Sequence, residues 1–160
     1  MLWTLPPKHK IYEALGAVAD GRIEIIDPNS KIIEARQYSS SRQKYYTILY
    51  NPAQNQIMPN DNATWYVGYL SYPAISLLLF VGKIKYDAAI LSYFKDISFK
   101  DINQKYKNDF DQANLEIVAM ILARGLGEVK LNTEIDSAYQ QLTDLRLQYL
   151  GHKTQPPSGY

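Results

Sequence analysis

Basic and aromatic side chains cluster around a serine-rich turn in the first third of the chain. They are Arg36, Tyr38, Arg42, Lys44 and Tyr45, with Ser39, Ser40 and Ser41 between them. Basic groups neutralise phosphates, hydroxyls bond phosphate oxygens, and aromatic rings offer stacking surfaces for bases. The cluster therefore predicts a nucleic-acid-binding face on a hairpin. The alternative is an ordinary solvated hairpin tip, in which Glu24 and Glu34 pair with the arginine.

A second group of polar and aromatic residues opens the longest uncharged stretch of the sequence. It comprises Asn60, Asp61, Asn62, Trp65, Tyr66 and Tyr69. A carboxylate, two amides, an indole and two phenols are able to line a pocket, and a helix amino end there would favour an anion. This group predicts the alternative function, a small enzyme or a small-ligand-binding protein. In the simpler interpretation the polar residues cap a helix and the aromatic rings belong to the core or a subunit contact.

Other chemistry finds little support in the sequence. The charged residues between 100 and 111 are mixed in sign at helical spacing, which is typical of a solvated face. Cysteine is absent and the two histidines, His9 and His152, lie far apart, so disulfides, thiol nucleophiles and multi-histidine metal sites are not expected. Phosphate-loop, hydrolase-elbow, zinc-protease and dinucleotide motifs are also missing. We therefore expect no catalytic residues, no metal and no cofactor, and a non-enzymatic binding or assembly protein.

The rest of the chain is expected to be organised around residues 63–82, twenty consecutive residues without a charge. Because apolar residues recur on all sides, this segment is predicted to form one buried core helix over about 62–82. One alternative is two shorter helices broken near Pro73, which lacks an amide donor. The other is a membrane span, for which about 20 residues just suffice. Three tyrosines and the lack of a flanking basic cluster argue against the span.

Residues before this stretch predict a helix and a small sheet. Helical spacing predicts a helix over 7–19, and three strand-like runs follow over 22–27, 31–38 and 43–50. Short connections between these runs favour an antiparallel meander. Alternation assigns a buried face to Ile23, Ile25, Ile33, Ala35, Tyr46, Ile48 and Tyr50. Lys44 falls on the opposite side from Tyr45, so the basic cluster shares one face only if the turn twists.

Residues after this stretch predict mainly helices. Asp87 is expected to cap a short helix through Phe94, and a long helix runs from Ser98 to about 124 with a deeply buried second half. Thr133 is expected to cap the last helix, and residues 57–58 add a short strand. The predicted fold class is α+β and helix-rich: a three-stranded antiparallel meander with an N-terminal helix, packed on a bundle of about four helices.

Length and composition predict one domain and a protein partner. We expect a single domain over 1–151, with a helix-plus-meander layer (1–58), a helical layer (59–151), and a flexible tail or surface strap over 152–160. A net charge of +1 argues against strongly electrostatic nucleic-acid binding by a monomer. Fourteen tyrosines favour an interface, and hence self-association or a protein partner. The N-terminal residues lack a signal-peptide pattern, so we expect a cytoplasmic protein; the composition also resembles that of thermophilic proteins.

Overall fold

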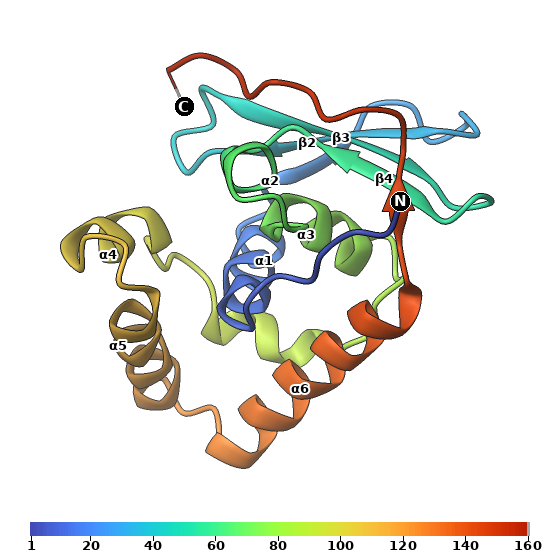
Figure 1. Cartoon of the computed structure of the whole chain (residues 1–160). Coiled ribbons are helices and arrows are strands. Elements are labelled where there is room, and N and C mark those ends of the chain that lie inside the picture. Colours follow the sequence, from blue (N-terminus) through green and yellow to red (C-terminus); the bar gives the residue numbers. More distant parts are fainter. Residues whose placement is uncertain (160) are drawn as a thin grey trace.

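The computed structural model describes residues 1–159 and has an α+β fold, in which a sheet lies over a layer of helices (Figure 1). Within these residues the sheet has five strands in the order β1-β2-β3-β4-β5. They are β1 (Ile23–Ile25), β2 (Ile33–Tyr38), β3 (Tyr45–Asn51), β4 (Gln56–Pro59) and β5 (Gln148–Tyr149). The predicted fold class is confirmed: β4 contains the short strand predicted over residues 57–58, and β5 is added to the predicted strands.

The first four strands pair antiparallel, and their register confirms the predicted buried face. Ala35 lies opposite Ile48, and Ile33 lies opposite Tyr50. All seven residues assigned to that face are buried or half-buried. The added strand β5 pairs in parallel with β4 through residues more than ninety positions away in sequence. No local pattern reveals such a pairing, because it depends on where the last helix delivers the chain.

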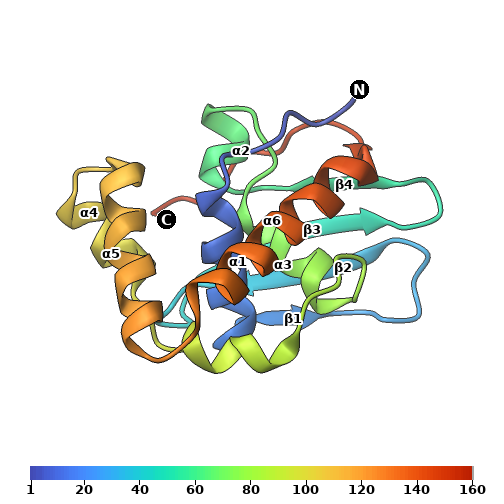
Figure 2. The ribbon, with the colours of Figure 1, turned by 90° about the horizontal axis from the view of Figure 1, so that it is seen from below.

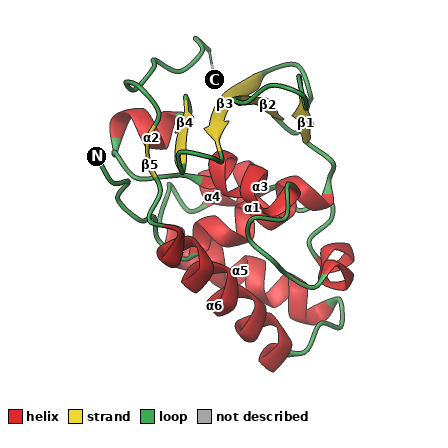
Figure 3. Ribbon diagram, turned by 90° about the vertical axis from the view of Figure 1, so that its right-hand side faces the viewer, coloured by secondary structure: helices red, strands yellow, loops and turns green. Residues whose placement is uncertain are grey.

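The helices cover one face of the sheet. α1 (His9–Ala19) packs against α3 (Tyr72–Phe80) directly beneath the strands. The remaining helical elements are α2 (Asn62–Tyr66), the 3-10 helix η1 (Ala88–Tyr93), α4 (Phe99–Lys105), α5 (Phe110–Ala123) and α6 (Glu128–Leu145). Figure 2 shows α6 crossing beneath α1 and α3, with α4 and α5 to one side, and Figure 3 shows the same two layers from the side. Among residues 1–159, no helix covers the other face of the sheet, which we call the outer face.

The uncharged stretch does not form the single helix predicted over 62–82. α2 ends at Tyr66, and the chain reverses at Gly68, whose φ of +98° suits glycine. The amide of Leu70 then donates to the carbonyl of Thr4 before α3 begins. Pro73 lies in the first turn of α3, where its missing amide costs nothing, so it opens a helix and does not break one.

Burial within this stretch is therefore uneven. The residues of α3 from Pro73 to Leu79 are buried, as predicted, whereas Tyr66 on α2 is 74% exposed. The break also shortens the apolar helix: within residues 1–159, no helix has the length and hydropathy needed to cross a membrane.

The predicted long helix over 98–124 is also divided. Lys107 and Asn108 adopt left-handed φ angles of 52° and 62°, and the Asp109 side chain accepts a hydrogen bond from the Gln112 amide to start α5. Neither glycine nor proline occurs at this break, so the sequence pattern does not predict it. The second half is not deeply buried throughout, since Leu115 is 63% exposed.

The last helix begins earlier than predicted. It starts after Gly127, and not at Thr133, because residues 128–132 already continue its helical turns. Its buried stripe contains Leu131, Ile135, Ala138 and Leu142.

The chain ends by returning across the sheet. The Trp3 ring lies 3.9 Å from the Tyr149 ring, and its indole N–H donates to the carbonyl of Ile57. We call residues 150–159 the C-terminal segment; it runs along the outer face, on the side away from α1 and α3 (Figure 1). Tyr160, the last residue of the predicted tail, lies outside the described residues. The buried residues of the hydrophobic core extend from Trp3 to Leu147, and from this segment the half-buried Leu150 packs against them.

Candidate functional site

Three residues of the predicted basic and aromatic cluster form a stack on the outer face. The Arg36 guanidinium lies 4.4 Å from the centre of the Tyr45 ring, and the Tyr45 and Tyr38 ring centres are 5.6 Å apart. The Tyr38 hydroxyl donates to the Glu24 carboxylate at 2.9 Å. β2 and β3 position the stack, because Arg36 and Tyr38 point to the same side as Tyr45 in the paired register. The stack thus combines one cation, two phenol rings and an acidic neighbour.

The other two basic residues of the cluster leave the stack. Arg42 adopts a left-handed φ of 62°, and its guanidinium donates to the carbonyl of Asp20 at 2.8 Å. This carbonyl lies at the C-terminal end of α1, where a cation is favourable. The Lys44 ammonium instead donates to the carbonyl of Gly159 in the C-terminal segment. The structure therefore does not bring all five predicted residues together.

The polar residues before α2 hold the backbone in place. The side-chain oxygen of Asn60 accepts a hydrogen bond from the Thr47 amide at 2.8 Å. Asp61 is 2% exposed and caps α2, with one carboxylate oxygen accepting from the Thr64 amide at 3.0 Å and the other from its hydroxyl at 2.7 Å. The amide of Asn62 donates to the Tyr46 hydroxyl at 3.2 Å. Capping therefore accounts for Asp61, while Asn60 and Asn62 tie α2 to β3.

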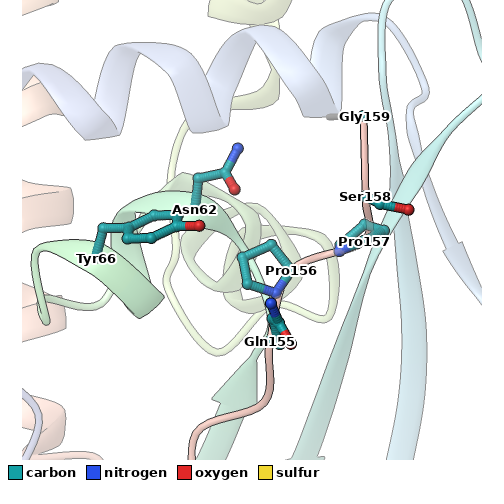
Figure 4. A pocket seen from close by; sticks show the side chains of 7 residues that line it. All are labelled: Asn62, Tyr66, Gln155, Pro156, Pro157, Ser158 and Gly159. Atoms are coloured by element: carbon teal, nitrogen blue, oxygen red, sulfur yellow. The ribbon is translucent and has the colours of Figure 1, made fainter.

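The two predicted patches meet at the C-terminal segment. A cavity of about 400 Å³ is lined by Asn62, Tyr66 and residues 155–159 (Figure 4). A neighbouring cavity of about 390 Å³ is lined by Lys44, Tyr45, Thr47, Asn60 and two residues of the segment, Pro157 and Ser158. Both cavities include Pro157 and Ser158, so they adjoin. We call the surface formed by Lys44, Tyr45, Thr47, Asn60, Asn62 and Tyr66 the outer groove.

A buried charged pair, which the sequence patterns did not reveal, lies between α1 and the neighbouring helices. Lys10 and Glu13 are 6% and 7% exposed, and their ammonium and carboxylate groups are 3.4 Å apart. The second Glu13 oxygen accepts from the Asn103 amide at 3.1 Å, and the Lys10 nitrogen lies 5.0 Å from the centre of the Phe110 ring. The signal was weak: the two residues stand three apart on the apolar side of a helix. Neither residue lines the two cavities described above.

Burial shifts the titration of the groups around this pair. Burial raises the pKa of Asp61, while hydrogen bonds from Thr64 and the charge of Lys10 oppose the rise. The pKa of Tyr72 lies well above its usual value because the hydroxyl is buried and the Glu13 carboxylate is near. Across the described part of the chain, no three or more His, Asp or Glu side chains are grouped so that they could hold a metal ion.

The raised pKa of Asp61 predicts a stability difference with a definite sign. Between the unfolded pKa, near the ordinary value of 3.8, and the higher folded pKa, the folded chain keeps a proton that the unfolded chain has lost. The contribution of Asp61 to stability is therefore greatest below the unfolded pKa and falls as pH rises through this window. In Asp61→Asn, the side-chain oxygen of the asparagine can still accept a hydrogen bond from the backbone amide of Thr64. Asparagine does not titrate, so the dependence of stability on pH that comes from residue 61 disappears. Urea unfolding at a series of pH values should show wild type losing stability relative to Asp61→Asn as pH rises.

Asp87 provides a control, because its pKa shifts in the direction opposite to that of Asp61. The pKa of Asp87 is lowered, first by its hydrogen bond with Lys130, so its contribution is present above the unfolded pKa and is lost as pH falls. Wild type should therefore gain stability relative to Asp87→Asn as pH rises. Slopes of the same sign for both variants would contradict the assignment.

Together, the open sheet face, the helical layer beneath it and the outer groove define a small α+β protein with a groove-bearing sheet. The chain belongs to the family described as "Uncharacterised conserved protein UCP014422", whose model matches residues 3–148. The matched range includes every residue of the outer groove and stops before the C-terminal segment. Neither the curated proteins nor the solved structures gave a match.

Proposed function

We propose that this protein is a non-enzymatic binding module and that the outer groove is its ligand-binding surface. The observation that carries the proposal is the convergence of two separate patches, around Tyr45 and around Tyr66, on adjoining cavities along one extended segment. Helices cover the other face of the sheet, so the outer face is the side on which a ligand can approach. A cytoplasmic location is part of the proposal.

The chemistry of the groove residues favours recognition over catalysis. The groove offers two phenol rings, two amides, a hydroxyl and an ammonium group, which are groups that orient a ligand through hydrogen bonds and stacking. Catalysis by acid and base requires titratable groups within hydrogen-bond reach of the reacting atoms. Asp61 is a buried carboxylate next to the groove residues Asn60 and Asn62, and both of its oxygens accept hydrogen bonds from Thr64. The proposal includes the alternative that the groove binds a small ligand beside Asn62 and Tyr66.

The proposal is tested by NMR titration of the isotope-labelled full-length protein with a panel of short peptides, single-stranded oligonucleotides and small anions. A true ligand should shift the amides of groove residues first. Tyr66→Ala should weaken its binding about tenfold or more, since aromatic anchors dominate such sites. Phe80→Ala, which truncates an exposed aromatic ring on α3, is the matched control and should leave affinity unchanged. Ligands that shift only residues of α5 and α6, or equal losses in both variants, would overturn the proposal.

A second candidate function is nucleic-acid binding, and the observation that favours it is the Arg36, Tyr45 and Tyr38 stack. An exposed antiparallel sheet face with aromatic rings is a platform on which unpaired bases stack. Replacing Arg36, Arg42 and Lys44 together by alanine should then weaken oligonucleotide binding and flatten its salt dependence. Arg42 is hydrogen-bonded to the end of α1 and Lys44 to the C-terminal segment. Arg36→Ala alone should therefore account for most of the loss of oligonucleotide affinity. No binding by wild type at low salt would remove this candidate.

A further inference from the structure

We propose that the partner of the outer groove is an extended, proline-containing peptide segment of another protein, and that residues 155–159 occupy the groove as its intramolecular counterpart. This inference rests on the proposed function and names the chemical class of the ligand. It is carried by the residues that line the cavity together with Asn62 and Tyr66, namely Gln155, Pro156, Pro157, Ser158 and Gly159.

The sequence of the segment fixes its shape before it docks. A proline ring holds its own φ near −65° and pushes the preceding residue into an extended conformation. Gln155 precedes Pro156, and Pro156 precedes Pro157, so two successive residues are extended by local sterics. Residues 153–157 accordingly form neither helix nor strand. A ligand of this kind loses little conformational entropy on binding, which is why aromatic grooves are used to recognise it.

The groove supplies the groups that such a peptide needs. Figure 4 shows the Tyr66 ring pointing toward Pro156, with the segment passing between α2 and the strands. Tyr45 and Thr47 line the cavity on the other side, next to Pro157 and Ser158. The prolines have no amide hydrogen to satisfy, whereas the carbonyl of Gly159 accepts from the Lys44 ammonium. Tyr66 and Tyr45 therefore line cavities that the two prolines also line, and the Lys44 ammonium holds the backbone beyond them.

The part of the segment beyond Leu150, which packs against the core, is attached so that it can leave without disturbing the core. Hydrogen bonds of the described residues hold it near its two ends, from the Leu150 amide to the Ile57 carbonyl at 3.2 Å and from Lys44 to Gly159. None of residues 150–159 is buried, and the family match ends before them. A partner peptide of similar chemistry can therefore replace the segment while the sheet and helices stay in place.

Tethering sets the strength of the competition. A short flexible linker holds its end at an effective concentration on the order of millimolar. In the intact chain, residues 155–159 therefore cover the groove most of the time. Weakening the segment by substitution should therefore expose the groove to peptide added in solution. This expectation separates a recognition groove from a surface on which the segment merely rests.

The test uses the full-length chain carrying Pro156→Gly and Pro157→Gly, titrated with a synthetic peptide that has the sequence of residues 152–159. Binding is followed through the amide signals of groove residues, and the unchanged signals of α5 confirm that the variant is folded. We expect the peptide to bind the variant about tenfold or more tightly than wild type, because the internal competitor has been weakened. A peptide with both prolines replaced by glycine should bind far more weakly, and adding Tyr66→Ala to the variant should weaken binding of the original peptide.

Three results would overturn the inference, and they separate it from the proposed function. Equal binding of the proline and glycine peptides would show that proline is not recognised. Groove shifts caused by a single-stranded oligonucleotide, but not by the peptide, would reject the peptide partner and leave the binding groove standing. If peptides, oligonucleotides and small anions all failed to shift the groove signals of the variant with the weakened segment, both the peptide partner and the binding groove would be rejected.

Discussion

Replacing Lys10 by methionine is expected to lower the free energy of unfolding by about 3–5 kcal/mol, because it leaves the Glu13 carboxylate buried without its cation. Glu13 would keep the amide of Asn103 at 3.1 Å but lose the ammonium at 3.4 Å. Methionine has nearly the length of lysine and fills the space beside Phe110, so packing loss contributes little. Equilibrium unfolding in urea, followed by circular dichroism, measures the difference.

Two variants isolate the cause of this loss. Lys8, two residues earlier, pairs with Asp136 at 2.8 Å on the surface, with 56% and 62% of the two side chains exposed. Lys8→Met should therefore cost less than about 1 kcal/mol. Replacing both members of the buried pair, Lys10→Met with Glu13→Leu, should recover much of the stability, since no unpaired charge remains. If Lys10→Met cost no more than Lys8→Met, the pair would not be buried as described.

Replacing Gly16 by alanine is expected to destabilise the fold by about 1–3 kcal/mol, although alanine is the better helix former. A β-carbon at position 16 would lie 2.4 Å from a ring carbon of Phe99. Phe99 is itself buried at the start of α4 and has little room to retreat. The close approach of the Phe99 ring to α1 therefore depends on the missing side chain, and thermal or urea unfolding should reveal its cost.

Relief of the clash provides the check on this explanation. In the double variant Gly16→Ala with Phe99→Leu, the smaller side chain leaves room for the new methyl group. The two substitutions should therefore be less costly together than the sum of their separate effects. Gly127→Ser is the matched control, because open space surrounds that position and serine is a good helix cap. A stabilised Gly16→Ala protein would contradict the close contact.

The sheet could be predicted from the sequence because its signal is local. Alternation placed Ile48 and Tyr50 on the buried face, and short turns placed neighbouring strands side by side. The central helix could not be predicted as well, because tertiary contact decides where it breaks. Leu70 bonds to Thr4, far away in sequence, and this contact competes with continuing the helix beyond Tyr66.

The residues of the candidate site were predicted as two separate patches, and their meeting in one groove was not predicted. Both patches were visible as residue types, but their meeting depends on the tie from Asn60 to Thr47 and on the path of residues 155–159. The sequence also placed the basic residues in one group, whereas the structure turns Arg42 toward α1 and Lys44 toward Gly159. The buried pair of Lys10 and Glu13 escaped prediction because charged residues are expected at the surface.

The most direct measurement of the central claim is the nuclear Overhauser effect between the Pro156 and Pro157 rings and the aromatic protons of Tyr66 and Tyr45 in the full-length protein. If the outer groove is a binding surface filled by residues 155–159, these cross-peaks should be present. They should disappear when an excess of the competing peptide is added. Absent cross-peaks, with random-coil shifts for residues 153–159, would contradict the account.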